Sequence, residues 1–132
     1  MKLSVRLGCW ATCLLLMVAV SGCGGEGGPK TVKVKGKITK DGAAVSVPAG
    51  GLGTISFNEL VNGNIGAEIF QGIISADGTF EVDVAPGKYR VAVLVLDKAG
   101  GTDAYGRKYD AAQSTIEKEV TGAVSDMEIA LP

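Results

Sequence analysis

Apolar and polar residues alternate with a period of two along most of the chain after Thr31. Val32, Val34 and Ile38 alternate with lysines, and a period of two places successive side chains on opposite faces of a β-strand. The pattern recurs in five later segments, at 54–58, 80–84, 89–95, 116–120 and 127–131. No segment after Thr31 combines helical spacing with helix caps, so the pattern predicts strands throughout.

Turn-forming residues separate these segments. Asp41-Gly42 and Asn62-Gly63-Asn64 predict turns, and Asp77-Gly78 predicts a tight hairpin turn of type I′, because both residues tolerate positive φ. Pro86-Gly87 predicts a type II turn in which the glycine takes the positive φ. The segment 89–96 is apolar on both faces, which is typical of a strand in the middle of a sheet.

About seven short strands in about 100 residues is the count of an immunoglobulin-like β-sandwich. We therefore predict one all-β domain over residues 31–132, with a core that carries the stability without a disulfide. The predicted core consists of the inward-facing positions Val32, Val34, Ile55, Phe57, Phe80, Val82, Tyr89, Val91, Val93, Ile129 and Leu131.

The start of the chain has a different pattern. Residues 1–22 combine a short basic beginning with an apolar run, which is the layout of a cleaved secretion signal. Val20, Ser21 and Gly22 lead into Cys23 and resemble a bacterial lipobox, in which the cysteine thiol is lipidated and the chain is cut just before it. We expect a lipid anchor on Cys23, and the alternatives are an uncleaved membrane anchor or an ordinary signal.

Residues 23–30 are the predicted lipidated cysteine and tether. The stretch is rich in glycine and poor in apolar residues, which is typical of a flexible linker. Seven extended residues reach about 25 Å at about 3.5 Å each, so we expect the domain to stay close to the bilayer. Gly24 stands where the inner-membrane retention signal of enteric lipoproteins has aspartate. We therefore expect a protein secreted across the inner membrane and held at the periplasmic face of the envelope, with the outer membrane favoured.

The composition excludes several classes of chemistry. The chain holds 13 basic and 14 acidic residues, and loss of Lys2 and Arg6 with the signal leaves 11 against 14, a net of −3, which argues against a nucleic-acid partner. There is no histidine, and the cysteines are Cys9 and Cys13 in the signal and Cys23. The domain therefore offers no imidazole base, free thiol nucleophile or ordinary zinc site, and we expect no cofactor, metal or catalytic residue.

Lys33, Lys35 and Lys37 form a row on the outward face of the first predicted strand. Charged outward residues protect an edge strand from pairing with another chain, and we favour this interpretation. Close to a short tether, the same row also offers contacts to anionic lipid headgroups, each contributing about 1 kcal/mol near a membrane surface.

The segment 98–113 lacks periodicity and is rich in Gly, Asp, Lys and Tyr. Tyr105, Arg107 and Tyr109 give it the composition of a recognition loop, whereas packing of Tyr109 onto the domain would pin the loop instead.

Three aspartates of the same region offer oxygens to calcium. Asp97, Asp103 and Asp110 lack the alternate-position carboxylates of a calcium loop, so we favour solvated loop acids.

Three motifs follow one another along the domain: Val34-Lys35-Gly36-Lys37-Ile38-Thr39, then Asp77-Gly78-Thr79-Phe80, then Ala85-Pro86-Gly87-Lys88-Tyr89-Arg90-Val91. Their order resembles the carboxypeptidase regulatory-like (transthyretin-like) domain of small planctomycete-type bacterial envelope lipoproteins. The resemblance covers nearly all of residues 31–132 and implies a seven-stranded, prealbumin-like sandwich on a lipoprotein, with no assigned biochemical role. Some transthyretin-like relatives hydrolyse a purine-derived substrate with histidines, which this chain lacks.

We predict a non-catalytic, lipid-anchored envelope protein with a binding or assembly role and an unassigned ligand. Its expected partners are the membrane, through the lipid on Cys23, and other envelope proteins or a polysaccharide. The alternatives are a carbohydrate-binding module and a weak hydrolase that uses carboxylates and tyrosines.

Overall fold

The computed structural model describes residues 30–132, which form strands, turns and loops without a helix. The strands are β1 (Val32–Lys40), β2 (Ala43–Ala44), β3 (Leu52–Val61), β4 (Asn64–Ile74), β5 (Thr79–Val84), β6 (Gly87–Leu96), β7 (Glu117–Val120) and β8 (Val124–Leu131). The all-β class predicted from the alternation is confirmed, with eight strands in place of about seven. Over the same described residues, no helix is long and apolar enough to cross a bilayer.

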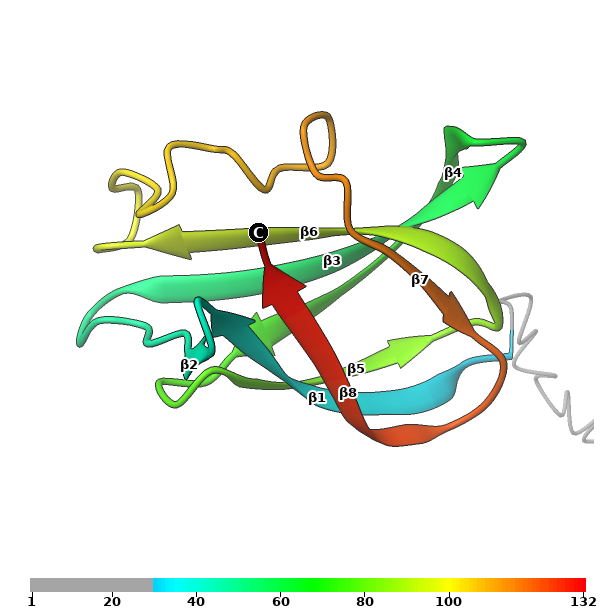
Figure 1. Ribbon diagram of the computed structural model, residues 1–132, viewed down its shortest axis with the longest axis horizontal. Coiled ribbons are helices and arrows are strands. Elements are labelled where there is room, and N and C mark those ends of the chain that lie inside the picture. Colours follow the sequence, from blue (N-terminus) through cyan, green and yellow to red (C-terminus); the bar gives the residue numbers. More distant parts are fainter. Residues whose placement is uncertain (1–29) are drawn as a thin grey trace, which may run out of the picture.

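The eight strands form one continuous sheet in the order β2-β1-β5-β4-β3-β6-β7, with β8 paired to β1. Every pairing is antiparallel except that of β1 with β8, which run parallel. Figure 1 shows the sheet curling, with β3 and β6 along one side and β1, β5 and β8 along the other. Hydrogen bonding therefore runs through a single curled sheet, and the assignment to an immunoglobulin-like or transthyretin-like sandwich stays a prediction.

The core lies inside the curl. Ten of the eleven predicted core positions are buried, and Val32, at the start of β1, is half-buried. Phe57 lies at its centre, with its ring centroid 6.3 Å from that of Phe80 and 6.0 Å from that of Tyr89. Tyr109, which alternation could not assign, is also fully buried. β6 lies between β3 and β7, as its two apolar faces predicted.

Two of the predicted turns have the geometry that their residues favour, and the Asp77-Gly78 turn does not. Asp41 and Gly42 have φ of 52° and 79°, and Asn62 and Gly63 have φ of 51° and 80°, the paired positive values of a type I′ hairpin. The type I′ prediction for Asp77-Gly78 was wrong, because only Gly78 has positive φ, at 82°. The loop is one residue longer: the Gly78 amide donates to the Ser75 carbonyl, and the Ser75 amide donates to the Thr79 carbonyl.

The type II turn predicted at Pro86-Gly87 was also wrong. Gly87 does not have positive φ and is the first residue of β6. The Tyr89 hydroxyl donates to the Ala85 carbonyl at 2.6 Å, which fixes the chain reversal between β5 and β6. A Cβ on Gly87 would lie 3.2 Å from that hydroxyl. Glycine therefore fits this position because the Tyr89 side chain leaves little space for a larger residue.

Candidate functional site

The segment 97–116 lies along the edge of β6 that β7 leaves uncovered. β7 pairs only with Gly87–Arg90 of β6. Beyond Arg90 the loop replaces β7 as the hydrogen-bonding partner of β6. The Val91 amide donates to the Ile116 carbonyl, and the Val93 amide donates to the Tyr109 carbonyl, both at 2.8 Å. The loop therefore satisfies backbone groups that an edge strand would expose.

Asp103 holds the middle of this loop. Its side chain is buried, with Oδ1 accepting the Val95 amide at 3.1 Å and Oδ2 accepting the Arg107 amide at 2.6 Å. Ser114 fixes the far end of the loop, since its Oγ donates to the Val91 carbonyl at 2.5 Å. These buried hydrogen bonds give the loop a fixed shape.

The three predicted recognition residues have different surroundings. Tyr109 is buried in the core and its hydroxyl donates to the Pro132 carbonyl, so it pins the loop and does not offer its ring to a ligand. Tyr105 is half-buried, with its ring centroid 5.4 Å from that of Tyr109. Burial also raises the pKa of Tyr105, which disfavours a phenolate nucleophile. Arg107 is exposed, and its Nε lies 3.4 Å from Asp110 Oδ2.

A groove of about 810 Å³ lies between this loop and the outer face of the sheet, and we call it the loop groove. Its floor comes from β3 and β6, and its wall comes from the loop. The floor residues are Thr54, Ser56, Ala92, Leu94 and Leu96, and the wall includes Thr102, Gly106, Arg107 and Asp110. An apolar floor beside an exposed guanidinium can bind a ligand that has an apolar part and an anionic group, because the planar fork of arginine suits carboxylate and phosphate.

Sequence reasoning missed the floor of the loop groove. Ala92, Leu94 and Leu96 lie on the second apolar face of the segment 89–96, and a second apolar face beside a long loop was the available signal.

The calcium alternative finds no support in the three aspartates. Asp97 Oδ1 accepts the Thr102 amide, and Asp110 Oδ1 accepts the amides of Ala112 and Gln113. The prediction of solvated loop acids was wrong for Asp103, which is buried and bound by two backbone amides. Each of the three carboxylates therefore stabilises the loop. Within residues 30–132, no three His, Cys, Asp or Glu side chains lie close enough together to hold a metal ion.

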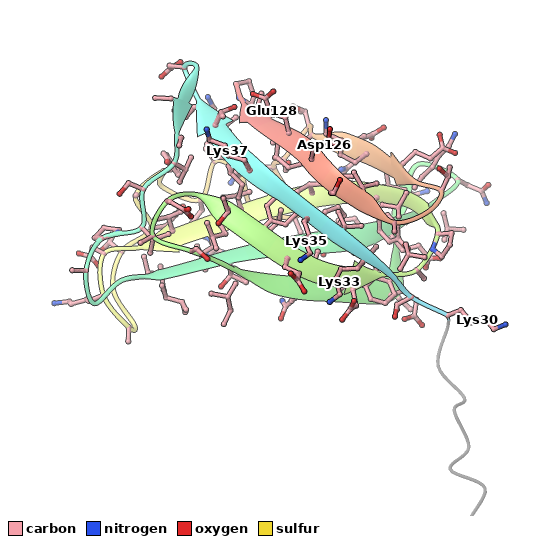
Figure 2. The ribbon with its side chains drawn as sticks, turned by 90° about the horizontal axis from the view of Figure 1, so that it is seen from below. Lys30, Lys33, Lys35, Lys37, Asp126 and Glu128 are labelled. Atoms are coloured by element: carbon pink, nitrogen blue, oxygen red, sulfur yellow. The ribbon has the colours of Figure 1, made fainter. Side chains whose placement is uncertain are left out.

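The lysine row lies on the outward face of β1, as predicted, but β1 is not an edge strand. β1 pairs with β5 on one side and β8 on the other, so the edge-protection interpretation was wrong (Figure 2). Lys33 Nζ lies 2.6 Å from Glu81 Oε1, and Lys35 Nζ lies 2.7 Å from Glu81 Oε2. These two ammonium groups lower the pKa of Glu81 to about 2.

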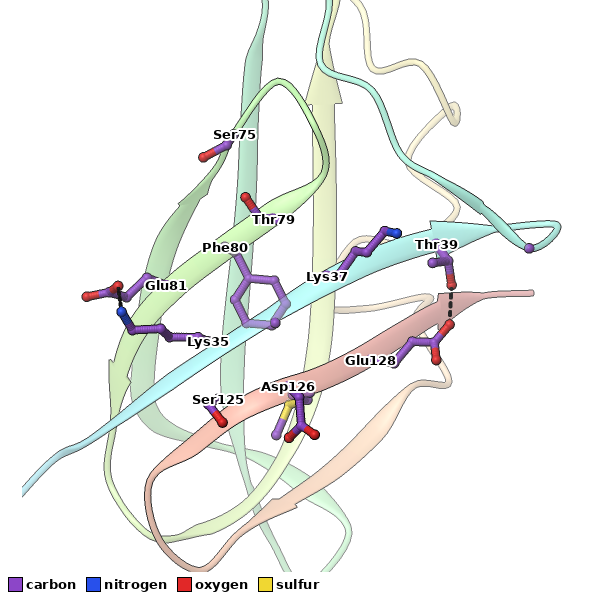
Figure 3. A pocket seen from close by; sticks show the side chains of 13 residues that line it. Lys35, Lys37, Thr39, Ser75, Thr79, Phe80, Glu81, Ser125, Asp126 and Glu128 are labelled. Atoms are coloured by element: carbon purple, nitrogen blue, oxygen red, sulfur yellow. Dashed lines mark hydrogen bonds and ion pairs between the residues drawn. The ribbon is translucent and has the colours of Figure 1, made fainter.

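A second groove, of about 730 Å³, lies over β1, β5 and β8, and we call it the charged groove (Figure 3). Lys35 and Lys37 line it together with Glu81, Asp126 and Glu128, and Glu128 also accepts the Thr39 hydroxyl at 3.0 Å. Two cations beside three carboxylates create no positive field. The structure therefore adds no support to the predicted contact between the lysine row and anionic headgroups.

The lipobox residues Val20, Ser21 and Gly22 and the lipidation site Cys23 lie outside the described residues. The signal segment 1–22 does so as well.

Comparison with solved structures finds a DUF3823 family protein from Bacteroides ovatus, with 21% sequence identity and a TM-score of 0.45. The match covers 76% of this chain and 43% of that protein, so this chain spans less than half of its length. No protein-family model and no curated protein matches the chain. A likeness at this level carries no functional argument, and the resemblance to carboxypeptidase regulatory-like domains stays a prediction.

Proposed function

We propose that this protein is a non-catalytic, lipid-anchored module of the cell envelope that binds a ligand in the loop groove. The observation that carries the binding role is the construction of that groove. Buried anchors, Asp103, Tyr109 and Ser114, hold the loop in place, whereas Arg107 is exposed beside an apolar floor. A rigid frame that presents an exposed guanidinium, ion-paired on one side with Asp110, beside an apolar surface is pre-organised for binding.

The anchoring part of the proposal is supported by the sequence of residues 1–23 and by the position of β1. Lys30 lies at one end of the long axis of the molecule, and the turn after β6 lies at the other (Figures 1 and 2). A short tether at Lys30 would keep the first end close to the bilayer. The loop beside the groove would then begin at the end farther from the membrane.

Intact mass of the protein extracted from membranes tests the anchor. We expect a species that begins at Cys23 and carries added acyl mass, because the lipobox directs cleavage and lipidation there. A Cys23→Ser variant serves as the control and should lose the acyl mass. An unmodified chain that still begins at Met1 would overturn the anchor.

Amide chemical shifts test the loop groove. The probe is hexanoate, which combines a carboxylate with an apolar chain, and 1-hexanol is the uncharged control. We expect hexanoate to shift the amides of Ala92 and Gly106, and Arg107→Gln to weaken binding by about tenfold because a charge-assisted contact is lost. Lys98→Gln, in the same loop but away from the groove lining, should bind as before. Shifts confined to other surfaces would contradict the proposal.

A further inference from the structure

The apolar outer face of the sheet continues beyond the loop groove. β3 and β4 pair in regular register where Gly53–Asn58 lies opposite Ile69–Ile74. In this stretch Thr54 pairs with Ile73 of β4 on one side and with Leu94 of β6 on the other. Side chains of directly opposed residues share a face of the sheet, so Ile73, Thr54 and Leu94 form one row across three strands. Thr54 and Leu94 line the loop groove, and Ile73 lies next to it.

This row is open to solvent at its β4 end. Ile73 is 70% exposed, the largest exposure among the large apolar side chains of the described residues. A second row, with Leu52 of β3 opposite Leu96 of β6, lies beside the first, and Leu52 is 41% exposed. Contiguous exposed apolar surface next to a groove is typical of a binding surface. The two rows therefore extend the floor of the loop groove from β6 across β3 to β4.

Each end of the first row carries charge. Beyond Ile73, the residue opposite on β5 is Glu81, whose carboxylate is ion-paired with two lysines of β1. Beyond Leu94, the wall of the groove carries the exposed guanidinium of Arg107, whose Nε faces Asp110. A guanidinium has further N–H donors on its two Nη atoms, and these suit a ligand carboxylate. The row is therefore an apolar path with a cation at one end and an ion-paired carboxylate at the other.

The backbone holds Arg107 at its end of the path. Its φ is 66°, in the left-handed region that residues with long side chains rarely adopt. The buried carboxylate of Asp103 accepts the Arg107 amide at 2.6 Å and stabilises this conformation. Strained backbone of this kind occurs preferentially at ligand-binding positions. Arg107 is therefore the fixed end of the path, where the anionic group of a ligand would start.

We propose that the ligand of the loop groove is a free, single-chain fatty acid. Its carboxylate would bind Arg107, and its chain would cross β6 and β3 and end beside Ile73. This inference rests on the proposed function and adds the class and the length of the ligand. The loop beside the groove begins at the end of the molecule farther from Lys30 (Figures 1 and 2), which favours a free acid over a lipid that stays in the bilayer.

The width of the sheet sets the length of the chain. Adjacent strands lie about 4.8 Å apart, so the path from the loop over β6 and β3 to β4 covers about 10–15 Å. An extended chain grows by about 1.3 Å for each carbon–carbon bond of about 1.5 Å, so about eight to twelve carbons fill the path. A longer chain would meet the ion-paired carboxylate of Glu81, which ends the apolar surface.

Photo-crosslinking with fatty acids of two lengths measures where the chain ends. The probes are hexanoate and decanoate, each with a diazirine at the carbon farthest from the carboxylate. They are added to the protein extracted from membranes and reconstituted in nanodiscs of phosphatidylcholine, and digestion with mass spectrometry locates the adducts. We expect hexanoate to label β6 or β3 and decanoate to label Ile69–Ile74 of β4. An excess of unmodified decanoate should suppress both adducts.

Two isoleucine variants test the end of the path. Ile73→Ser should raise the decanoate concentration for half-maximal labelling about fivefold, because apolar contact with the chain is lost, and leave that of hexanoate unchanged. Ile65→Ser, on the same strand but outside the row, is the matched control and should behave like the unchanged protein. Both isoleucines are exposed, and equal melting temperatures would show that the fold is kept. Arg107→Gln should weaken labelling by both probes.

The outcomes separate this inference from the proposed function. Labelling of the groove floor by hexanoate, without labelling of β4 by decanoate, would overturn the path and the length of the ligand alone. Absence of groove labelling by either probe would overturn both proposals. Equal effects of Ile65→Ser and Ile73→Ser would also overturn the path.

Two further outcomes concern other occupants of this face. Phosphatidylglycerol with the same diazirine-bearing acyl chain, placed in the nanodisc, is the lipid control. Labelling of β4 by this lipid but not by decanoate would overturn the free acid. Loss of decanoate labelling as the protein concentration rises would show that a second copy covers Ile73, and it would also overturn the proposal.

Discussion

Asp103 is the one charged side chain that is buried among residues 30–132. Burial of a carboxylate is costly unless hydrogen bonds compensate it, and here two backbone amides from different parts of the chain do so. One amide belongs to β6 and the other to the loop. A single side chain therefore joins the loop that forms the groove wall to the strand that forms the groove floor.

We predict that Asp103→Ala lowers the free energy of unfolding by about 3 kcal/mol, since hydrogen bonds to charged groups contribute about 1.5–3 kcal/mol each. Asp97→Ala removes one exposed hydrogen bond from the same loop and should cost less than about 1 kcal/mol. Urea unfolding of both variants measures the difference. Equal costs would contradict the anchoring role of Asp103.

Glu81 is the residue whose ionisation the structure changes most clearly. Its folded-state pKa is about 2, below the ordinary value of 4.5, because Lys33 and Lys35 hydrogen bond to its carboxylate. A lowered folded-state pKa adds stability above the ordinary pKa, and this contribution is lost as pH falls through the folded-state value. We expect a carboxyl ¹³C titration with a midpoint near 2.

The same titration in lysine variants tests whether Lys33 and Lys35 lower the pKa of Glu81. Lys33→Ala with Lys35→Ala should return the pKa of Glu81 toward 4.5, whereas Lys37→Ala, whose ammonium makes no ion pair with Glu81, should change it little. Added salt should also raise the pKa, because exposed charges are screened. A pKa that stays low in the double variant would point to another cause.

At the scale of elements, the pairing of β1 with β8 depends on Gly36. A Cβ at this position would lie 2.0 Å from the Met127 carbonyl oxygen and 2.8 Å from Cζ of Phe80. The glycine lets three neighbouring strands, β1, β5 and β8, approach closely where the β1–β8 register shifts between Val34 and Gly36.

We predict that Gly36→Ala lowers the free energy of unfolding by about 3 kcal/mol, because the new methyl group forces the backbone of β8 to move. Gly122→Ala is the matched control, since a Cβ there would have nothing within 4 Å and its φ is not positive. It should be neutral or stabilise by up to about 1 kcal/mol. Thermal unfolding of both variants measures the two changes in stability. A Gly36→Ala variant with an unchanged free energy of unfolding would exclude this close approach.

At the scale of the whole molecule, one continuous sheet leaves no part that can separate easily. The first strand pairs with the last, and the loop 97–116 is hydrogen bonded to the middle of β6. We therefore predict a single unfolding transition, with far-UV and near-UV circular dichroism coinciding and the calorimetric enthalpy equal to the van't Hoff enthalpy. An earlier near-UV transition would show that the tyrosine-rich loop detaches first.

The strands and their buried faces could be predicted because alternation is a local property of the sequence. Phe57, Val82 and Val91 face the core as their spacing indicates. The turn types at Asp77-Gly78 and Pro86-Gly87 could not be predicted from the sequence. The hydrogen bonds that close these turns depend on loop length and on the position of Tyr89. The position of β1 within the sheet could not be predicted from local sequence patterns either, because its partner β8 is the last strand of the chain.

The candidate site was predictable only in part. The loop 98–113 was identified from its composition, and Arg107 is exposed as a recognition residue must be. The anchoring role of Asp103 and Ser114 was not predictable, since their partners are backbone groups of a strand distant in sequence.

The place of β1 between β5 and β8 has a mechanical consequence. Val32–Lys37 pair with β5 and Val34–Lys40 pair with β8, and β1 begins two residues after Lys30. Tension that enters through Lys30 runs along the axis of β1 and loads the hydrogen bonds to both neighbours in shear, so they must break together. Resistance to such a pull is set by the unfolding barrier. If the proposed lipid tether continues from Lys30, the domain would thus withstand a pull between that tether and a ligand bound in the loop groove.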